Sequence, residues 1–417
     1  MTSAPSDRSG LGLVAALAAA SAWIAASAAS QRRGFVVFAV LALVIAAAWR
    51  TARRGPRGAL YTTAFGLLLC ASVVLGLEVV LHLWPGVLGG AVANVAYTGY
   101  HWQRSGIYRL DAHRGPVIRP SVHRRLYWNG HWWSHTANED GYRGPRVSTA
   151  DAVFLGDSMV YGHGVDDDRT LAASFARLTG LAAANLGQQG TCQLQSLLTW
   201  RAVGRALHPR YVFASVHFTD LAEIDLMYEA EEQRRFREDA GYVPLAVAQY
   251  RPRPWWDPIA FWSTHLAAPL RVSGILGTLV QAARAGRLRH ATRDEEAVWS
   301  LPTEENLARP FPTGGPGWAT ERHALARLQR ECTEAGARLV LFDIGYPRAF
   351  TAEVESIAGQ IGADYSPAGR VVLARGQGGE DVYLKNDGHW TPLGNDLMAR
   401  ELAGAVGAAL LPQAGVR

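Results

Sequence analysis

The chain has 417 residues, a length typical of two to three domains, and it is 49% hydrophobic but only 18% charged. Its net charge of +5 comes from the first 90 residues, because residues 91–417 hold 34 basic and 34 acidic side chains. The apolar content excludes a largely disordered chain, three cysteines exclude a disulfide-rich scaffold, and the balanced C-terminal part lacks the basic field that nucleic acid requires.

Three apolar runs open the chain, at residues 11–30, 34–49 and 59–84. A membrane-spanning helix needs about 20 apolar residues, so residues 1–90 are expected to form an anchor of three transmembrane helices. Four arginines lie between the second and third runs, which predicts a cytoplasmic loop there. The chain is therefore expected to be a multi-pass protein of the bacterial inner membrane with its larger part extracytoplasmic. A cleavable signal peptide is the alternative for the first run.

Residues 91–149 form a connecting segment that is rich in tyrosine and tryptophan. Such rings suit sugar stacking or a membrane interface, and packing on the following domain is the simpler alternative. His131 and His135 are four residues apart, but no Glu or Cys completes a known metal pattern. No metal site is therefore predicted in this segment.

From residue 150 onwards, apolar strands alternate with helical stretches. We expect strands at 152–155, 182–186, 211–218 and 338–344, with helices at 170–179, 193–207, 320–335 and 392–410. This alternation predicts an α/β domain over 150–412, with a parallel sheet covered by helices on both faces. Residues 226–320 interrupt it as an insertion, a candidate lid or substrate-selecting element.

Reactive side chains follow the predicted strands, where α/β sheets place their sites. Ser158 follows the first strand, and Gly190 follows the second. A serine needs a neighbouring base and a group that orients this base, and both His389 and Asp387 lie on one short segment near the C-terminus. Gly190 has no side chain, so its N–H can approach a developing oxyanion.

Four sequence blocks resemble those of the SGNH (GDSL-type) hydrolase superfamily over about residues 140–410. They are Asn138-Glu-Asp-Gly-Tyr-Arg-Gly144, Phe154-Leu-Gly-Asp-Ser-Met-Val-Tyr-Gly162, Asn185-Leu-Gly-Gln-Gln-Gly190 and Asp387-Gly-His-Trp-Thr-Pro-Leu-Gly394. The resemblance implies a flavodoxin-like three-layer α/β/α fold and no metal or organic cofactor. It also implies site roles: Ser158 as the nucleophile, His389 as the general base, Asp387 as its orienting group, the N–H groups of Ser158 and Gly190 as the oxyanion hole, and Asp157 and Asp220 as structural residues.

Two blocks depart from the family pattern. A further block of the family, which follows the third predicted strand, usually reads Gly-x-Asn-Asp, and its asparagine amide completes the oxyanion hole. The matching residues of this chain are His217-Phe218-Thr219-Asp220. Thr219 then takes the place of the asparagine, and loss of one such donor costs about 10²–10³-fold in rate. The last block reads Asp-x-His instead of Asp-x-x-His, which resembles the alginate O-acetyltransferase branch, although that branch carries the block ahead of its serine.

These features predict a membrane-anchored extracytoplasmic serine esterase that hydrolyses O-acyl esters of an envelope glycan or lipid through an acyl-enzyme. An O-acyltransferase acting on a cell-surface polysaccharide is the alternative, because the two reactions share the acyl-enzyme. A non-catalytic envelope protein on a degenerate fold is the third possibility, which Thr219 supports. The sequence leaves open whether Cys192 and Cys332 pair.

Overall fold

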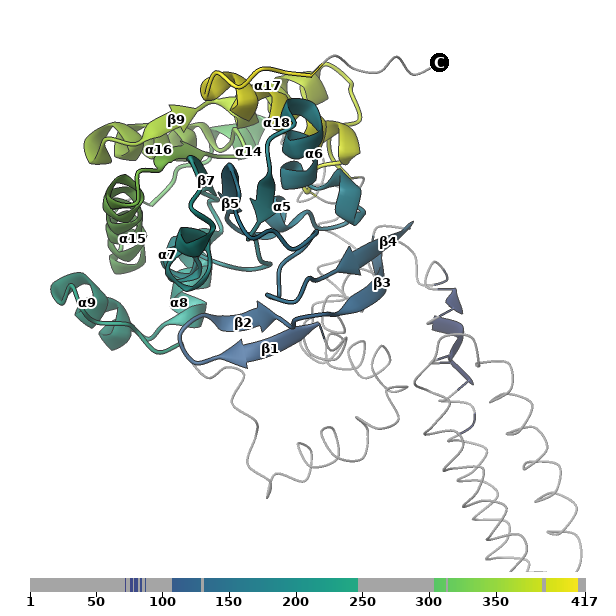
Figure 1. Ribbon diagram of the computed structural model, residues 1–417, viewed down its shortest axis with the longest axis horizontal. Helices are drawn as coiled ribbons and strands as arrows, with labels where there is room; N and C mark the ends of the chain where they lie inside the picture. The colour runs from purple at the N-terminus through teal and green to yellow at the C-terminus, as the bar shows by residue number, and fades with distance from the viewer. Residues whose placement is uncertain are drawn as a thin grey trace, which may run out of the picture. The chain divides into compact units, whose positions relative to one another are not determined.

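The computed structural model describes residues 107–128, 131–246, 304–312, 314–384 and 388–411, together with a few residues between 72 and 87. The chain divides into two compact units, residues 1–100 with 252–289, and residues 101–251 with 290–417. Every element described below belongs to the second unit (Figure 1). The domain boundaries expected from the sequence remain predictions.

Five parallel strands form one sheet in the order β6-β5-β7-β8-β9. They are β5 (Ala152–Leu155), β6 (Ala183–Asn185), β7 (Tyr211–Ser215), β8 (Arg338–Phe342) and β9 (Asp364–Ser366). In register, Phe154 of β5 lies between Asn185 of β6 and Phe213 of β7. The predicted parallel α/β sheet is confirmed, and β5 to β8 are its four predicted strands.

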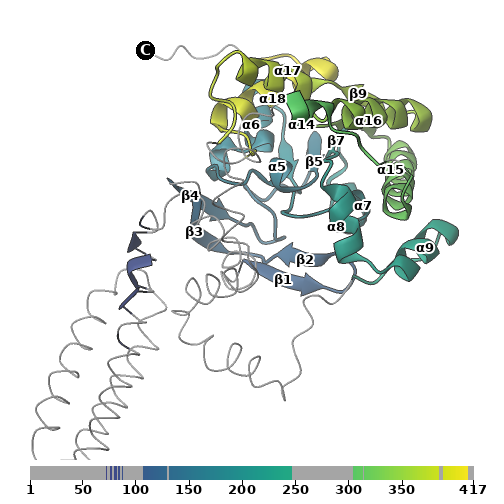
Figure 2. The same ribbon diagram turned by 180° about the vertical axis from the view of Figure 1, so that it is seen from behind.

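Helices cover both faces of this sheet, which gives three layers (Figures 1 and 2). One layer holds α7 (Gln193–Ala202), α15 (Pro316–Glu334) and α16 (Arg348–Ile361), and the other holds α6 (Leu171–Thr179), α17 (Ala368–Gln377) and α18 (Pro392–Ala405). Successive strand residues point to opposite faces. Val153 and Leu155 accordingly join the apolar core of the first layer, and Ala152 and Phe154 join the core of the second.

Two antiparallel hairpins precede the sheet, and the sequence pattern did not separate them into strands. They are β1 (Tyr108–Asp111) with β2 (Gly115–Ile118), and β3 (His123–Trp128) with β4 (His131–Thr136). Trp133 of β4 is buried in a cluster with Tyr161 of the α/β domain. The buried Arg143 guanidinium donates hydrogen bonds to the carbonyl oxygens of Tyr161, Gly162 and Val165. Part of the predicted connecting segment is therefore packed onto the domain, as the simpler alternative expected.

The remaining elements are short. They are the helices α5 (Ser158–Tyr161), α8 (Asp220–Met227), α9 (Ala230–Glu238) and α14 (Glu304–Ala308), and the 3₁₀ turns η2 (Asp167–Arg169) and η3 (Gly204–Leu207). Residues 247–303 of the predicted insertion lie outside the described residues. Cys192 and Cys332 are both buried and free, so they do not form a disulfide.

The predicted three-helix anchor is contradicted. No helix within the described residues is long and apolar enough to cross a membrane. The runs 11–30 and 34–49 and most of 59–84 lie outside those residues. An apolar run meets only the hydropathy requirement of a span, which also needs an unbroken helix of about 20 residues. The transmembrane anchor and the multi-pass inner-membrane location are therefore withdrawn.

Candidate active site

Ser158 lies on a tight turn between β5 and α5. Gly156, at the start of this turn, has φ +147°, and a Cβ on it would lie 2.7 Å from the Cβ of Ser215. Only glycine fits such a position without displacing the neighbouring strand. Asp157 then caps the helix, because its carboxylate accepts a hydrogen bond from the Met159 N–H at 3.1 Å. Ser158 is thereby held as the first residue of α5, at the carboxyl end of a central strand.

His389 contacts this serine directly. Its Nε2 atom lies 2.7 Å from the Ser158 Oγ atom, although 231 residues separate the two along the chain. Both side chains are half-buried, so the pair is accessible from solvent. The structure therefore brings together the two residues that the sequence predicted as nucleophile and general base, at the separation that proton transfer requires.

The segment that carries His389 is fixed at both ends. The backbone N–H of Leu384 donates to the His389 carbonyl oxygen at 2.8 Å. Thr391 caps α18 through its hydroxyl, which also donates to the Asp381 carbonyl oxygen at 2.6 Å. Asp387, the predicted orienting residue, lies outside the described residues, so its role stays a prediction.

The loop after β6, residues 186–190 and here called the β6 loop, packs against the serine turn. The Gln188 N–H donates to the Gly156 carbonyl oxygen at 3.0 Å. A Cβ on Gly187 would collide with the backbone N of Tyr161 and lie 2.7 Å from the Val160 carbonyl carbon. Gly190 ends the loop with φ +59°, in the left-handed region that favours glycine. The β6 loop is therefore positioned by main-chain contacts, as a main-chain oxyanion donor would require.

The loop after β7, residues 216–219 and here called the β7 loop, is held by side chains. The Asp220 carboxylate accepts hydrogen bonds from the His217 N–H at 3.0 Å and from Gln193 Nε2 at 2.7 Å. Thr219, predicted to replace the family's asparagine, has its Oγ1 atom 2.6 Å from His217 Nδ1. This hydroxyl is therefore engaged by a neighbouring side chain.

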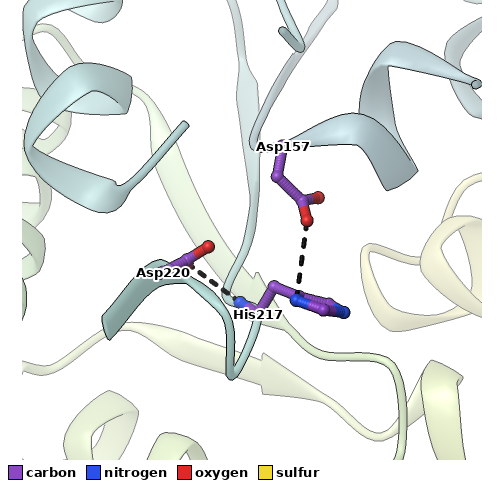
Figure 3. A group of neighbouring side chains, drawn as sticks. All are labelled: Asp157, His217 and Asp220. Atoms are coloured by element: carbon purple, nitrogen blue, oxygen red, sulfur yellow. Dashed lines mark hydrogen bonds and ion pairs between the residues drawn. The ribbon is translucent and has the colours of Figure 1, made fainter. Parts of the chain in front are cut away.

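Asp157, His217 and Asp220 form a compact group beside Ser158, in which each offers one candidate metal-ligand atom within 4.8 Å of the others (Figure 3). Each residue also has hydrogen-bonding partners within the protein. Asp157 accepts from Met159 N, Asp220 accepts from His217 N and Gln193 Nε2, and His217 Nδ1 accepts from Thr219 N at 3.2 Å. These bonds account for the arrangement without a metal ion, and the group fits a hydrogen-bonded support for the β7 loop.

Buried carboxyl groups lie behind the β7 loop. Burial, followed by the nearby Asp157 and Glu321, raises the pKa of Asp220 well above its ordinary value. Burial, together with Asp157, raises the pKa of Glu223 to about 7. Burial raises the pKa of Glu321 to about 8, although its Oε2 atom accepts a hydrogen bond from the Gln193 N–H at 2.6 Å. In all three groups, burial is the largest cause of the raised pKa.

Sequence reasoning missed a second histidine at the site. The ring of His163 lies 4.7 Å from that of His389 between centroids, and its Nδ1 atom is 2.6 Å from Gln189 Nε2. Gln189 in turn accepts a hydrogen bond from the Tyr108 hydroxyl at 2.9 Å. The first hairpin thus reaches the site through two side chains. The sequence signal for it was the position of His163, five residues after Ser158 and directly after the block that contains Ser158.

Comparison with known proteins gives matches to solved structures only. No protein-family model matches the chain, and no curated protein matches it. The solved structures include a GDSL-like lipase from Bacteroides thetaiotaomicron (13% identity, 61% of this chain, 87% of that chain, TM-score 0.29). They also include an α/β hydrolase from the metagenome of Lake Arreo in Spain (12% identity, 63% of this chain, 97% of that chain, TM-score 0.32). A third is an acetylxylan esterase from Geobacillus stearothermophilus (11% identity, 63% of this chain, 97% of that chain, TM-score 0.31).

Two of these solved structures carry names that agree with the family resemblance of the sequence blocks, GDSL-like lipase and acetylxylan esterase. At such TM-scores the likeness carries no argument about function. The chemistry of this chain therefore has to be inferred from its own residues.

Proposed function

We propose that this protein is a serine esterase that hydrolyses O-acyl esters through an acyl-enzyme on Ser158. The observation that carries the proposal is the 2.7 Å contact between Ser158 Oγ and His389 Nε2. A serine hydroxyl is a weak nucleophile, and a base at hydrogen-bonding distance is what activates it. The position of Ser158 on a constrained turn, with half-buried access to solvent, supports the same role.

In the first half of the reaction, Ser158 Oγ attacks the ester carbonyl carbon while its proton passes to His389 Nε2. The resulting oxyanion receives hydrogen bonds from the backbone N–H groups of Ser158 and Gly190. The intermediate then collapses, the bond to the leaving oxygen breaks, and His389 returns the proton to the departing alcohol. Asp387 is proposed to hold the His389 ring and to stabilise its charged form.

In the second half, water replaces the alcohol. His389 removes a proton from the water, whose oxygen attacks the acyl carbon, and the intermediate collapses to release the acid and regenerate the Ser158 hydroxyl. If a sugar hydroxyl took the place of water, the same residues would transfer the acyl group instead. Product analysis with an added glycan acceptor distinguishes the two outcomes.

The substrate is proposed to be an O-acyl ester of a glycan or a lipid. Half-buried Phe218 follows His217 in the β7 loop, and its ring lies 5.8 Å from that of Tyr346 between centroids. The Tyr346 hydroxyl is 3.5 Å from the position that a Cβ on Gly388 would take, which places it beside the His389 segment. A phenyl face with a phenol hydroxyl suits a sugar ring or an acyl chain.

The test is hydrolysis of p-nitrophenyl esters of increasing chain length by the full chain and three variants. Ser158→Ala and His389→Ala each remove one partner of the activated pair, and we expect kcat/KM to fall by about 10⁴-fold or more. Ser356→Ala is the matched control, because this serine is exposed on α16, and it should retain full activity. Equal activity of Ser158→Ala and the parent would contradict the proposal.

A further inference from the structure

His217 lies in the β7 loop beside Asp157, the residue that precedes Ser158, and the sequence analysis assigned it no role. It follows β7, the strand that pairs with the Ser158-bearing strand β5. Its Nδ1 atom is 3.7 Å from the Asp157 carboxylate, and Asp157 immediately precedes Ser158. Burial lowers the pKa of the His217 ring, the Asp157 carboxylate opposes this shift, and a charge on nearby His389 adds to it. His217 therefore interacts with the residue before Ser158 in the sequence and with the base that contacts Ser158.

The proton on the His217 ring can be assigned from its neighbours. The backbone N–H of Thr219 points at Nδ1 with a distance of 3.2 Å. A backbone N–H only donates, so Nδ1 is an acceptor and carries no proton. Burial lowers the pKa of His217, which favours the neutral ring. The single ring proton is therefore on Nε2, which lies at the end of the ring away from Asp157 (Figure 3).

The same geometry assigns the Thr219 hydroxyl. Its Oγ1 atom lies 2.6 Å from Nδ1, and since Nδ1 accepts, the hydroxyl donates its one proton there. A hydroxyl that donates to His217 has no second proton for an oxyanion. The asparagine-like role expected of Thr219 therefore needs another donor in the same loop, and His217 Nε2–H is a donor of that kind.

We propose that His217 donates its Nε2–H to the oxyanion as the third donor of the hole, and that Thr219 is a positioning residue that sets the tautomer and the angle of this ring. This inference rests on the proposed esterase function and deepens it. A neutral imidazole can act as an electrophile of this kind. Its neutrality also avoids a second positive charge beside His389, which becomes protonated during the reaction.

The test is a pair of substitutions that each keep one ring nitrogen. In His217→Gln the amide nitrogen can occupy the place of Nε2, and in His217→Asn it occupies the place of Nδ1. We expect kcat of His217→Gln to stay within about tenfold of the parent value. We expect kcat of His217→Asn to fall by about 10²–10³-fold with KM little changed, because loss of an oxyanion donor usually has an effect of this size. His217→Phe keeps a ring of similar shape but has no donor, so its kcat should fall as far as that of His217→Asn.

Thr219 variants complete the test. Thr219→Ser keeps the hydroxyl and should match the parent, whereas Thr219→Val removes it and should lower kcat by about tenfold through misplacement of the ring. A loss of 10²–10³-fold in Thr219→Val beside normal activity in His217→Asn and His217→Phe would overturn the inference in favour of the hydroxyl. Equal activity of the Gln, Asn and Phe variants would overturn it as well.

Failure of this inference is distinguishable from failure of the proposed function. Ester hydrolysis that depends on Ser158 in the parent establishes the function before any His217 variant is compared. Thermal melting of each variant checks folding, and a His217→Phe variant that does not fold leaves the Gln and Asn pair as the deciding comparison. In a parent that shows no hydrolysis dependent on Ser158, both the function and the inference are contradicted.

Discussion

The β6 loop and the β7 loop flank Ser158, and they are built in opposite ways. The β6 loop is set by main-chain bonds and close glycine contacts, such as that of Gly187 with Val160. The β7 loop depends on the side chains of His217, Thr219 and Asp220. A loop positioned by its main chain is sensitive to added side-chain volume but not to changes in side-chain chemistry. A loop positioned by side-chain hydrogen bonds is sensitive to changes in that chemistry. Different substitutions should therefore disrupt the two loops.

We expect the largest effect on stability from a substitution that adds side-chain volume to the β6 loop. Gly187→Ala places a methyl group against the main chain of Val160 and Tyr161, which cannot move aside as a side chain would. We expect a loss of about 3 kcal/mol in the free energy of unfolding, measured by denaturant titration. Gly359→Ala is the control, because Gly359 lies in α16 with no atom within 4 Å of the added methyl group, and alanine there should stabilise the helix by about 0.5–1 kcal/mol. Equal stability of the two variants would contradict the claim that close main-chain contacts position the β6 loop.

The next effect tests the chemistry of the β7 loop. Asp220→Ala removes the acceptor of the His217 N–H and of Gln193 Nε2 in a fully buried place. We expect a cost of about 2–3 kcal/mol and a fall in kcat of about tenfold or more, because unpaired buried donors are costly and the loop shifts. Asp220→Asn keeps an acceptor oxygen of similar shape and should stay within about 1 kcal/mol. If both variants behaved alike, side-chain chemistry would not hold this loop.

Glu321 lies beside the first residue of α7, because it accepts a hydrogen bond from the Gln193 N–H, and the Gln193 side chain donates to Asp220. Burial raises the pKa of Glu321 to about 8 from an unfolded value near 4.5. The folded state therefore binds this proton more tightly, and the stability it contributes is complete below pH 4.5 and is lost as the pH rises towards 8. We expect a fall of about 2 kcal/mol in unfolding free energy between pH 6 and pH 8, and Glu321→Gln should remove most of it.

Glu334→Gln is the control for this pH dependence, since Glu334 is exposed at the end of the same helix. It should show the same decline as the parent. A Glu321→Gln variant whose stability declines with pH as steeply as the parent's would show that another group carries the effect.

The smallest expected effect comes from the contact between the first hairpin and the β6 loop. Tyr108→Phe removes the hydroxyl that donates to Gln189 and leaves the ring in place. The loss of one part-buried hydrogen bond should cost about 1 kcal/mol, with kcat within about threefold of the parent. A much larger loss of kcat would show that the Tyr108–Gln189–His163 chain of contacts positions His389.

The β6 side of the site was more predictable from the sequence than the β7 side. The order and spacing of the blocks around Ser158, Gly190 and His389 follow from strand ends that meet at one edge of a parallel sheet, and the contact of Ser158 with His389 agrees with that expectation. The β7 loop was harder, because hydrogen bonding to Thr219 fixes the His217 tautomer and depends on three-dimensional geometry that residue spacing does not encode.

The elements that were missed are short, or they are stabilised by contacts with residues that are distant in the sequence. Strand β9 has three residues, two of them half-buried, and therefore shows no continuous apolar run. The hairpin strands of residues 108–136 show no regular alternation of apolar and polar residues. They are stabilised by packing such as that of Trp133 against Tyr161 and by the buried Arg143. The predicted anchor is contradicted because no helix in the part of the chain that the structure describes is long and apolar enough to cross a membrane.

The most direct test of the account is the reaction of the full chain with a fluorophosphonate probe, with the labelled residue located by peptide mass. We expect one adduct on Ser158, formed with a rate that falls by about 10³-fold or more in His389→Ala, because the contact of 2.7 Å is what activates the hydroxyl. A folded protein that stays unlabelled at Ser158, or labels equally fast without His389, would contradict the claim that these two residues form an activated nucleophile.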